Sequence, residues 1–182
     1  MRCKLLWFIH HVKNSDSIHM LKSVEWSPYD KIATTLIAYT DASTVGMGIW
    51  FPGECAGFQC FLPVDGPKDL IFFYEALTVY SAFCLGAGYG CDWIAVYLDN
   101  TNTVDMFSPF QAKPTYNPIL MSSVDFNINN SIATKVYYVP GKQNIVADHL
   151  SRFQNAKALQ LALKLQFRSF QPPQDVMGAF KK

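Results

Sequence analysis

Four acidic residues stand where predicted strands end or predicted helices begin, and this placement makes them the first candidates for chemistry. Asp41 follows an apolar stretch that starts at Leu36, and Asp99 follows the apolar run "WIAVYL". Glu75 lies early in a long apolar segment, and Asp148 lies one turn into a segment with helical spacing. An aspartate at a strand end is usually a turn former whose side chain accepts backbone hydrogen bonds. A reactive role for Asp41 therefore depends on whether the fold brings the four acids together.

A cluster of four carboxylates would be a site for a hard metal ion. Carboxylates that lie close together repel one another, which raises their pKa values unless cations neutralise them. An all-oxygen ligand set suits Mg²⁺ or Mn²⁺ and does not suit zinc. Two such ions roughly 4 Å apart are the usual device for in-line displacement at a phosphodiester. We therefore expect Mg²⁺ or Mn²⁺, two ions per site, with Asp41, Glu75, Asp99 and Asp148 as ligands.

The pattern of apolar and turn residues predicts the strands that would position these acids. Three strand-like runs, separated by Gly, Pro and small polar residues, cover residues 34–41, 45–51 and 57–62. The almost wholly apolar run at residues 92–100 is typical of a buried central strand, and residues 134–140 are strand-like again. If the first and fourth strands are neighbours, Asp41 and Asp99 lie side by side outside strand ends, where sites in α/β sheets tend to form.

Helical spacing predicts four helices between and after these strands. The first covers residues 68–88, where an apolar stripe is closed by glycines. Two more are expected at residues 100–107 and 117–130. The last, at residues 141–153, places Asn144 where an N-cap residue belongs. This order of elements predicts a mixed sheet with helices on its faces.

The domain organisation follows from these elements. We expect an N-terminal connection or extension at residues 1–33, one α/β domain at residues 34–153, and a C-terminal tail at residues 154–182. In the tail, apolar and polar residues alternate from Leu159 to Phe167, which fits a strand, although the residues themselves are good helix formers. The sequence leaves this choice open.

The composition argues against several other classes of protein. Apolar residues make up 50% of the chain, so burial can drive folding, and the net charge of +1 gives no strong long-range attraction to nucleic acid or membrane. Five cysteines without a C-x-x-C pair argue against a disulfide framework and for reduced thiols inside a cell, in the cytoplasm or nucleus. The longest uncharged run, residues 76–91, has 16 residues and three glycines, so we expect a buried helix and no membrane span.

Four sequence blocks carry a specific resemblance. They are "YTDAS…GMGIWF", "FYEALTV", "VYLDNTNTV" and "VPGKQNIVADHLSR", in this order between Ile37 and Phe153. Together they resemble the ribonuclease H domain of LTR- and DIRS-type retrotransposon polyproteins. The resemblance implies an α/β ribonuclease H-like fold, with a five-stranded mixed sheet in the order 3-2-1-4-5 and helices on both faces.

The resemblance also implies an activity, which is metal-dependent cleavage of the RNA strand of an RNA–DNA hybrid. It places Asp41 between both ions, Glu75 and Asp99 on the ion at the leaving group, and Asp148 on the ion that activates water. The expected substrate contacts are Ser43, Asn100, Asn102 and Asn144. The segment before residue 34 resembles the connection to an upstream reverse transcriptase, which is therefore an expected partner alongside the hybrid.

Departures from the family pattern keep rival functions open. The segment "PGKQN" before the last helix lacks the histidine of cellular ribonucleases H, and residues 107–118 contain one charged residue, Lys113, instead of a basic grip on the hybrid. One rival is a catalytically silent ribonuclease H-like module, derived from a domesticated or decayed retroelement. The other is a nuclease of the same superfamily that acts on DNA, such as an integrase or resolvase.

Overall fold

The computed structural model of the chain describes residues 34–64, 67, 70–109 and 111–176, together with Leu6 and Ile9. Apart from these two residues, the expected connection over residues 1–33 lies outside the described part of the chain.

Six strands form one mixed sheet in the order β5-β4-β1-β2-β3-β6. The strands are β1 (Thr35–Ala42), β2 (Gly46–Phe51), β3 (Ala56–Phe61), β4 (Trp93–Leu98), β5 (Ala133–Tyr138) and β6 (Gln166–Ser169). The first three form an antiparallel meander, and β4 and β5 run parallel to β1. The expected order 3-2-1-4-5 is confirmed for these five strands. All five lie within about two residues of their predicted positions.

The sixth strand corrects the expected count of five. β6 runs parallel to β3, with Ala56 opposite Gln166 and Gln59 opposite Ser169. The outer edge of β3 would otherwise present unpaired N–H and C=O groups, which attract another strand. The alternating segment of the tail is therefore divided between two elements. Residues 159–161 are the end of helix α7 (Asn155–Leu161), and residues 166–167 are the start of β6.

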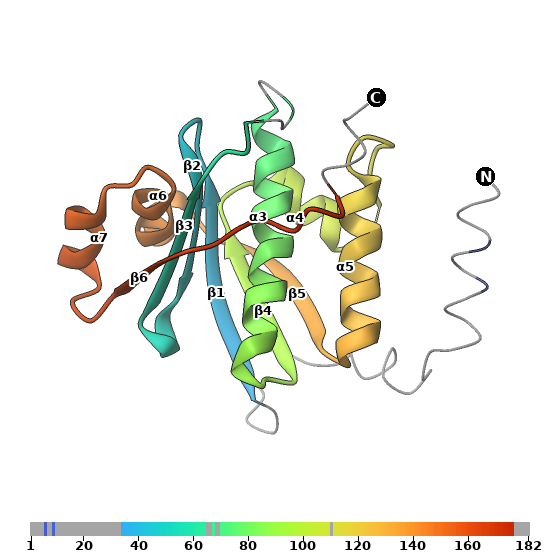
Figure 1. Cartoon of the computed structure of the whole chain (residues 1–182), viewed down its shortest axis with the longest axis horizontal. Coiled ribbons are helices and arrows are strands. Elements are labelled where there is room, and N and C mark those ends of the chain that lie inside the picture. The colour runs from blue at the N-terminus through green and yellow to red at the C-terminus, as the bar shows by residue number, and fades with distance from the viewer. Residues whose placement is uncertain are drawn as a thin grey trace.

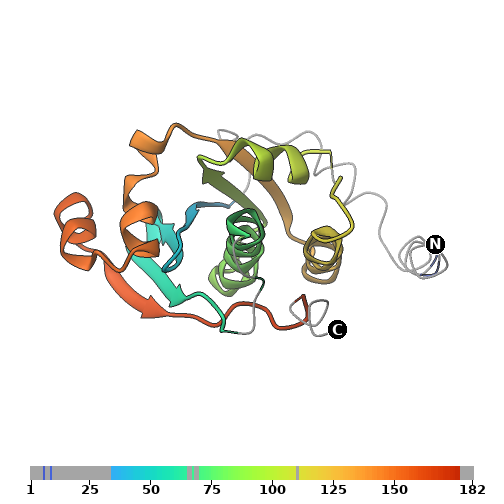
Figure 2. The same ribbon diagram turned by 90° about the horizontal axis from the view of Figure 1, so that it is seen from above.

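The remaining helices lie on both faces of the sheet. Figures 1 and 2 show α3 (Ile71–Gly86) and α5 (Asn117–Asn130) on one face and α6 (Ile145–Ser151) on the opposite face. α4 (Thr101–Phe107) follows β4 directly. Three short 3₁₀ turns complete the elements: η1 (Pro52–Glu54), η2 (Ala87–Tyr89) and η3 (Gly141–Gln143).

The main core lies between the sheet and α3. Alternate residues of the central strands, among them Ala38 in β1 and Ile94 and Val96 in β4, are fully buried against this helix. Among the described residues, one helical stretch, Ile71–Tyr89, is long and apolar enough to cross a membrane, and 67% of it is buried inside the fold. This burial agrees with the expected core helix, and it places Glu75 within the most apolar part of the molecule.

Candidate functional site

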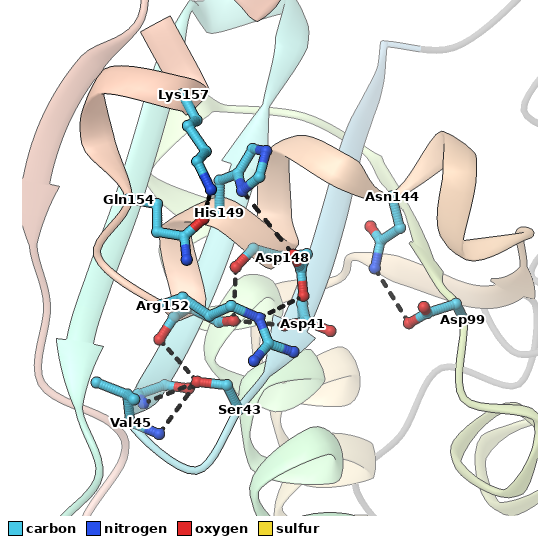
Figure 3. Close-up of polar contacts among 12 residues, drawn as sticks. Asp41, Ser43, Val45, Asp99, Asn144, Asp148, His149, Arg152, Gln154 and Lys157 are labelled. Atoms are coloured by element: carbon cyan, nitrogen blue, oxygen red, sulfur yellow. Dashed lines mark hydrogen bonds and ion pairs between the residues drawn. The ribbon is translucent and has the colours of Figure 1, made fainter.

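The four acids lie at one end of the sheet. β1 and β4 are parallel neighbours with Tyr39 opposite Tyr97, so Asp41 and Asp99, two residues further along each strand, lie at the same end. Glu75 reaches this end from the second turn of α3, and Asp148 reaches it from the first turn of α6. Figure 3 shows Asp148 on α6, with Asp41 close to it and Asp99 beside Asn144.

Burial and mutual repulsion perturb two of these carboxyl groups. Burial raises the pKa of Asp41 to about 6; a hydrogen bond from Ser151 opposes this rise, and the charges of Asp148 and Asp99 add to it. Burial raises the pKa of Glu75 to about 9, and the charges of Asp41 and Asp99 raise it further. Glu75 is 5% exposed and its Oε2 has no hydrogen-bond partner. At neutral pH and without a cation, Glu75 therefore keeps its proton.

Glycines in β2 allow α6 to lie directly on the sheet. A Cβ atom added at Gly48 would lie 2.5 Å from both the Ala147 carbonyl oxygen and the Ser151 amide nitrogen. A Cβ atom at Gly46 would lie 2.7 Å from the ring of Phe153. Since any side chain at Gly48 would push the helix away, the block "GMGIWF" has a packing role at the site.

One face of α6 presents three polar side chains to the other acids. Asn144, Asp148 and Ser151 are spaced i, i+4 and i+7, which places them on the same side of the helix. The Ser151 hydroxyl donates to Asp41 Oδ2 at 2.5 Å. Asn144 Nδ2 donates to the Thr40 carbonyl oxygen at 2.9 Å and to Asp99 Oδ1 at 3.3 Å (Figure 3).

Asp148 is paired with a cation from its own helix. Arg152 Nε donates to Asp148 Oδ1 at 2.7 Å, and His149 Nδ1 lies 3.9 Å from Asp148 Oδ2. The guanidinium also interacts electrostatically with Asp41. Arg152 therefore supplies positive charge beside the acids without entering the core.

The donor chemistry of the site fits a hard cation, but a complete set of ligands is not assembled. Within the described part of the chain, no three Asp, Glu, His or Cys side chains are placed so that they could hold a metal ion. Asp41 and Glu75 fit best, because both are buried, burial and the charges of neighbouring acids raise their pKa values, and Glu75 Oε2 lacks a partner. Mg²⁺ is commonly held by one or two carboxylates together with waters and substrate phosphates, so these two residues could serve as its protein ligands. Asp99 and Asp148 are engaged by Asn144 and Arg152.

The four residues that were expected to contact substrate differ in their burial and in their hydrogen bonds. Ser43 is buried, and its hydroxyl accepts from the Val45 and Gly46 amides and donates to the Ser151 carbonyl oxygen at 2.9 Å. Asn100 accepts from the Thr103 amide as the cap of α4, and Asn102 is exposed. Asn144 stands at the N-cap position of α6, but its side chain makes no cap hydrogen bond and is 1% exposed. The substrate roles of these residues stay predictions.

Sequence reasoning did not single out Ser151 and Arg152, although both belong to the "LSR" that ends the last block. Ser151 is fully buried and binds the carboxylate of Asp41, 110 residues away in the chain. The spacing of Asn144, Asp148 and Ser151 on one helical face was the available signal. The spacing did not indicate which group each side chain would bind.

Comparisons with known proteins agree on the fold. No protein-family model matches the chain. No curated protein matches its sequence either. Among solved structures, LC11-RNase H1 in complex with an RNA/DNA hybrid superposes with a TM-score of 0.55 at 17% identity, covering 68% of this chain and 99% of its own. The N-terminal RNase H domain of a Mycobacterium tuberculosis protein, solved as a fusion with maltose-binding protein, gives 0.51 at 15% identity, with 71% and 99% covered. The chain therefore has the expected ribonuclease H-like fold.

Proposed function

We propose that this chain is a metal-dependent endonuclease that cleaves the RNA strand of RNA–DNA hybrids. The observation that carries the proposal is the placement of four carboxyl groups, two of them buried, at the same end of β1 and β4, on a fold shared with a hybrid-bound ribonuclease H. A nuclease with this fold needs acids at this place, whereas a purely structural module gains nothing from two buried carboxyl groups with raised pKa values.

Each acid has a role that its surroundings support. Asp41 and Glu75 are the residues that would hold Mg²⁺ or Mn²⁺, with Asp99 and Asp148 completing the set for a second ion. When bound, two such ions activate the attacking water and stabilise the leaving oxygen. Glu75 gives up its proton when it becomes a ligand, because its carboxyl is otherwise neutral below about pH 9. Arg152, with 47% of its side chain exposed, can hold an anionic phosphate beside Asp148.

The proposal includes a context for this activity. The four sequence blocks favour a retroelement origin, in which the domain acts within, or derives from, a reverse transcriptase. An upstream reverse transcriptase domain would then be a partner that supplies much of the grip on the hybrid, because the net charge of +1 gives this chain little attraction for phosphate. The place of action would be intracellular, in the cytoplasm or nucleus.

One assay separates this function from its rivals. The chain is incubated with end-labelled RNA–DNA hybrid, RNA duplex and DNA duplex, each with Mg²⁺, Mn²⁺ or a chelator. We expect cuts in the RNA strand of the hybrid that need a divalent ion. Cleavage of the DNA duplex would support a DNA nuclease of the same superfamily and contradict the proposal.

A second candidate is a catalytically silent module with the same fold. The observation in its favour is that, among the residues described, no three potential ligands are placed to hold a metal ion. Binding of hybrid without cleavage under every metal condition, together with an unchanged melting temperature at millimolar Mn²⁺, would establish the silent module and reject the endonuclease.

A further inference from the structure

Ser151 differs from three other buried hydroxyl groups in the helices of this chain. Thr78, Ser81 and Ser123 are each at most 1% exposed, and each donates to the carbonyl oxygen four residues earlier in its own helix. Ser151 is 0% exposed and has two acceptors, the Asp148 carbonyl oxygen at 2.9 Å and Asp41 Oδ2 at 2.5 Å. One hydroxyl hydrogen serves one acceptor at a time, and the nearer acceptor is the carboxylate on β1.

The position of Ser151 is itself held from the strand side. Ser43, in the turn after β1, donates to the Ser151 carbonyl oxygen at 2.9 Å. Gly48 leaves no room between β2 and the Ser151 amide. The hydroxyl is therefore placed against Asp41 by contacts of the Ser151 backbone to the turn after β1 and to β2.

Asn144, at the N-terminal end of α6, binds the carboxylate of Asp99 as Ser151 binds that of Asp41. Its Nδ2 group bridges the Thr40 carbonyl oxygen on β1 and the Asp99 carboxylate after β4. Its Oδ1 is buried without a hydrogen-bond partner. The side chain thus ties Asp99, which is exposed, to the strand that carries Asp41.

We infer that Ser151 and Asn144 are positioning residues, which set the orientation and separation of the Asp41 and Asp99 carboxylates from the two ends of α6. The inference rests on the proposed function and deepens it. A short helix then organises three acids: it supplies Asp148 itself and holds the other two. Partners that orient ligand side chains in this way contribute to metal affinity although they do not touch the metal.

The first test uses Ser151→Ala in the full chain, with Ser123→Ala as the matched control. Both substitutions remove a fully buried helical hydroxyl, but Ser123 lies in α5 and bonds only to Ile119. We measure urea unfolding without metal, Mn²⁺ affinity by electron paramagnetic resonance, and kcat and KM on hybrid. Ser151→Ala should lower Mn²⁺ affinity and kcat by about 10–100-fold with KM unchanged. Ser123→Ala should change only the unfolding midpoint.

The second test uses Asn144→Ala with Asn127→Ala as its control. Asn127 also donates across elements, to Thr134 Oγ1 at 2.9 Å, and its Oδ1 is also buried without a partner. Asn144→Ala should lower Mn²⁺ affinity and kcat, whereas Asn127→Ala should affect stability alone. If Ser151→Ala does not fold, Ser151→Cys keeps the packing with a weak donor and should show the same loss of affinity.

The outcomes separate this inference from the proposed function. Wild-type protein that binds Mn²⁺ and cuts hybrid, with Ser151→Ala and Asn144→Ala indistinguishable from their controls, overturns the positioning roles and leaves the proposed function intact. Wild-type protein that neither binds Mn²⁺ nor cuts hybrid overturns both. Loss of Mn²⁺ affinity in the two variants, with control-like stability, supports the inference.

Discussion

The two helices that meet at the acidic end of the sheet, α3 and α6, contribute to it in opposite ways. α3 has 16 residues, is buried on nearly every side, and contributes one charged residue, Glu75. α6 has seven residues, packs on glycines, and contributes Asp148 together with side chains that bind the other acids. Apolar packing fixes the first helix, while close backbone approach and hydrogen bonds fix the second.

The difference separates two requirements of a carboxylate cluster. A buried acid lies among apolar groups, which raise its pKa and keep it neutral in the absence of a cation. Acids nearer the surface need partners that hold their orientation, because solvent would otherwise leave them free to rotate. In this chain α3 buries Glu75, and Asn144 at the start of α6 holds the exposed Asp99. Asp41 is itself buried and accepts its hydrogen bond from Ser151 at the end of α6.

The largest expected effect tests whether both helices belong to the site. Each of three substitutions should reduce hybrid cleavage by roughly three orders of magnitude or more, because each removes a negative charge from the ligand set. They are Glu75→Gln in α3, Asp148→Asn in α6 and Asp41→Asn at the end of β1. Single-turnover cleavage with Mg²⁺ measures the loss. Asp92→Asn and Asp105→Asn, which change exposed acids outside the cluster, should cut normally. If a folded variant of Glu75 or Asp148 cleaves hybrid at near the wild-type rate, the helix that carries that residue does not belong to the site.

The second effect tests the burial of Glu75 through pH. A folded-state pKa of about 9 against an ordinary value of 4.5 means that the folded protein binds more protons than the unfolded chain between these pH values. Stability of the metal-free protein should therefore fall as pH rises through this window, by at most about 1.4 kcal/mol per pH unit. Asp41 adds a smaller loss between pH 3.8 and about 6.

Glu75→Gln should flatten this dependence and make the metal-free protein more stable than wild type at pH 8, with little difference near pH 5. Urea unfolding in the presence of a chelator, from pH 5 to pH 9, measures both. Asp105→Asn serves as the control. If wild type and Glu75→Gln have the same slope, Glu75 is not a buried neutral acid.

The third effect tests the glycine contact under α6. Gly48→Ala places a methyl group 2.5 Å from two backbone atoms of the helix, so the helix must move. We expect a loss of about 1–3 kcal/mol in the free energy of unfolding, as for overpacked sites, and a fall in cleavage as Ser151 and Asp148 shift. Gly53→Ala, whose added Cβ meets no atom within 4 Å, is the control. Gly48→Ala with wild-type stability and cleavage would mean that close packing of α6 is not needed.

The smallest effect concerns Arg152. The pair with Asp148 is an exposed i,i+4 ion pair, and such pairs contribute about 0.3–0.5 kcal/mol. Arg152→Ala should therefore lower the free energy of unfolding by only about 0.3–0.5 kcal/mol more than Lys157→Ala does. Lys157 is exposed and donates to a neutral partner, Gln154. Chemical denaturation at neutral pH measures both variants. A loss several times larger for Arg152 would mean that the ion pair, and not the glycine contact, fixes α6.

The positions of most strands and helices followed from local sequence patterns, whereas the strand order came from the family resemblance. The strand runs around Asp41 and Asp99, the long apolar helix with Glu75, and the last helix with Asp148 all lie close to their predicted positions. Alternation, helical spacing and turn residues act over a few neighbouring positions, so they can be read without the rest of the chain. The tail was different, because β6 forms only where the open edge of β3 is available to pair with it.

By itself, the sequence determined which acids are present and which strand end or helix turn carries each one. Only the tertiary structure decided that Glu75 is neutral at pH 7, that Asn144 bonds to Thr40 and Asp99 instead of capping its helix, and that Ser151 bonds to Asp41. Burial and the choice of hydrogen-bond partner depend on atoms 45 to 110 residues away in the chain. No local pattern encodes those distances, because they are set by the packing of α6 on the glycines of β2 and of α3 against the opposite face of the sheet.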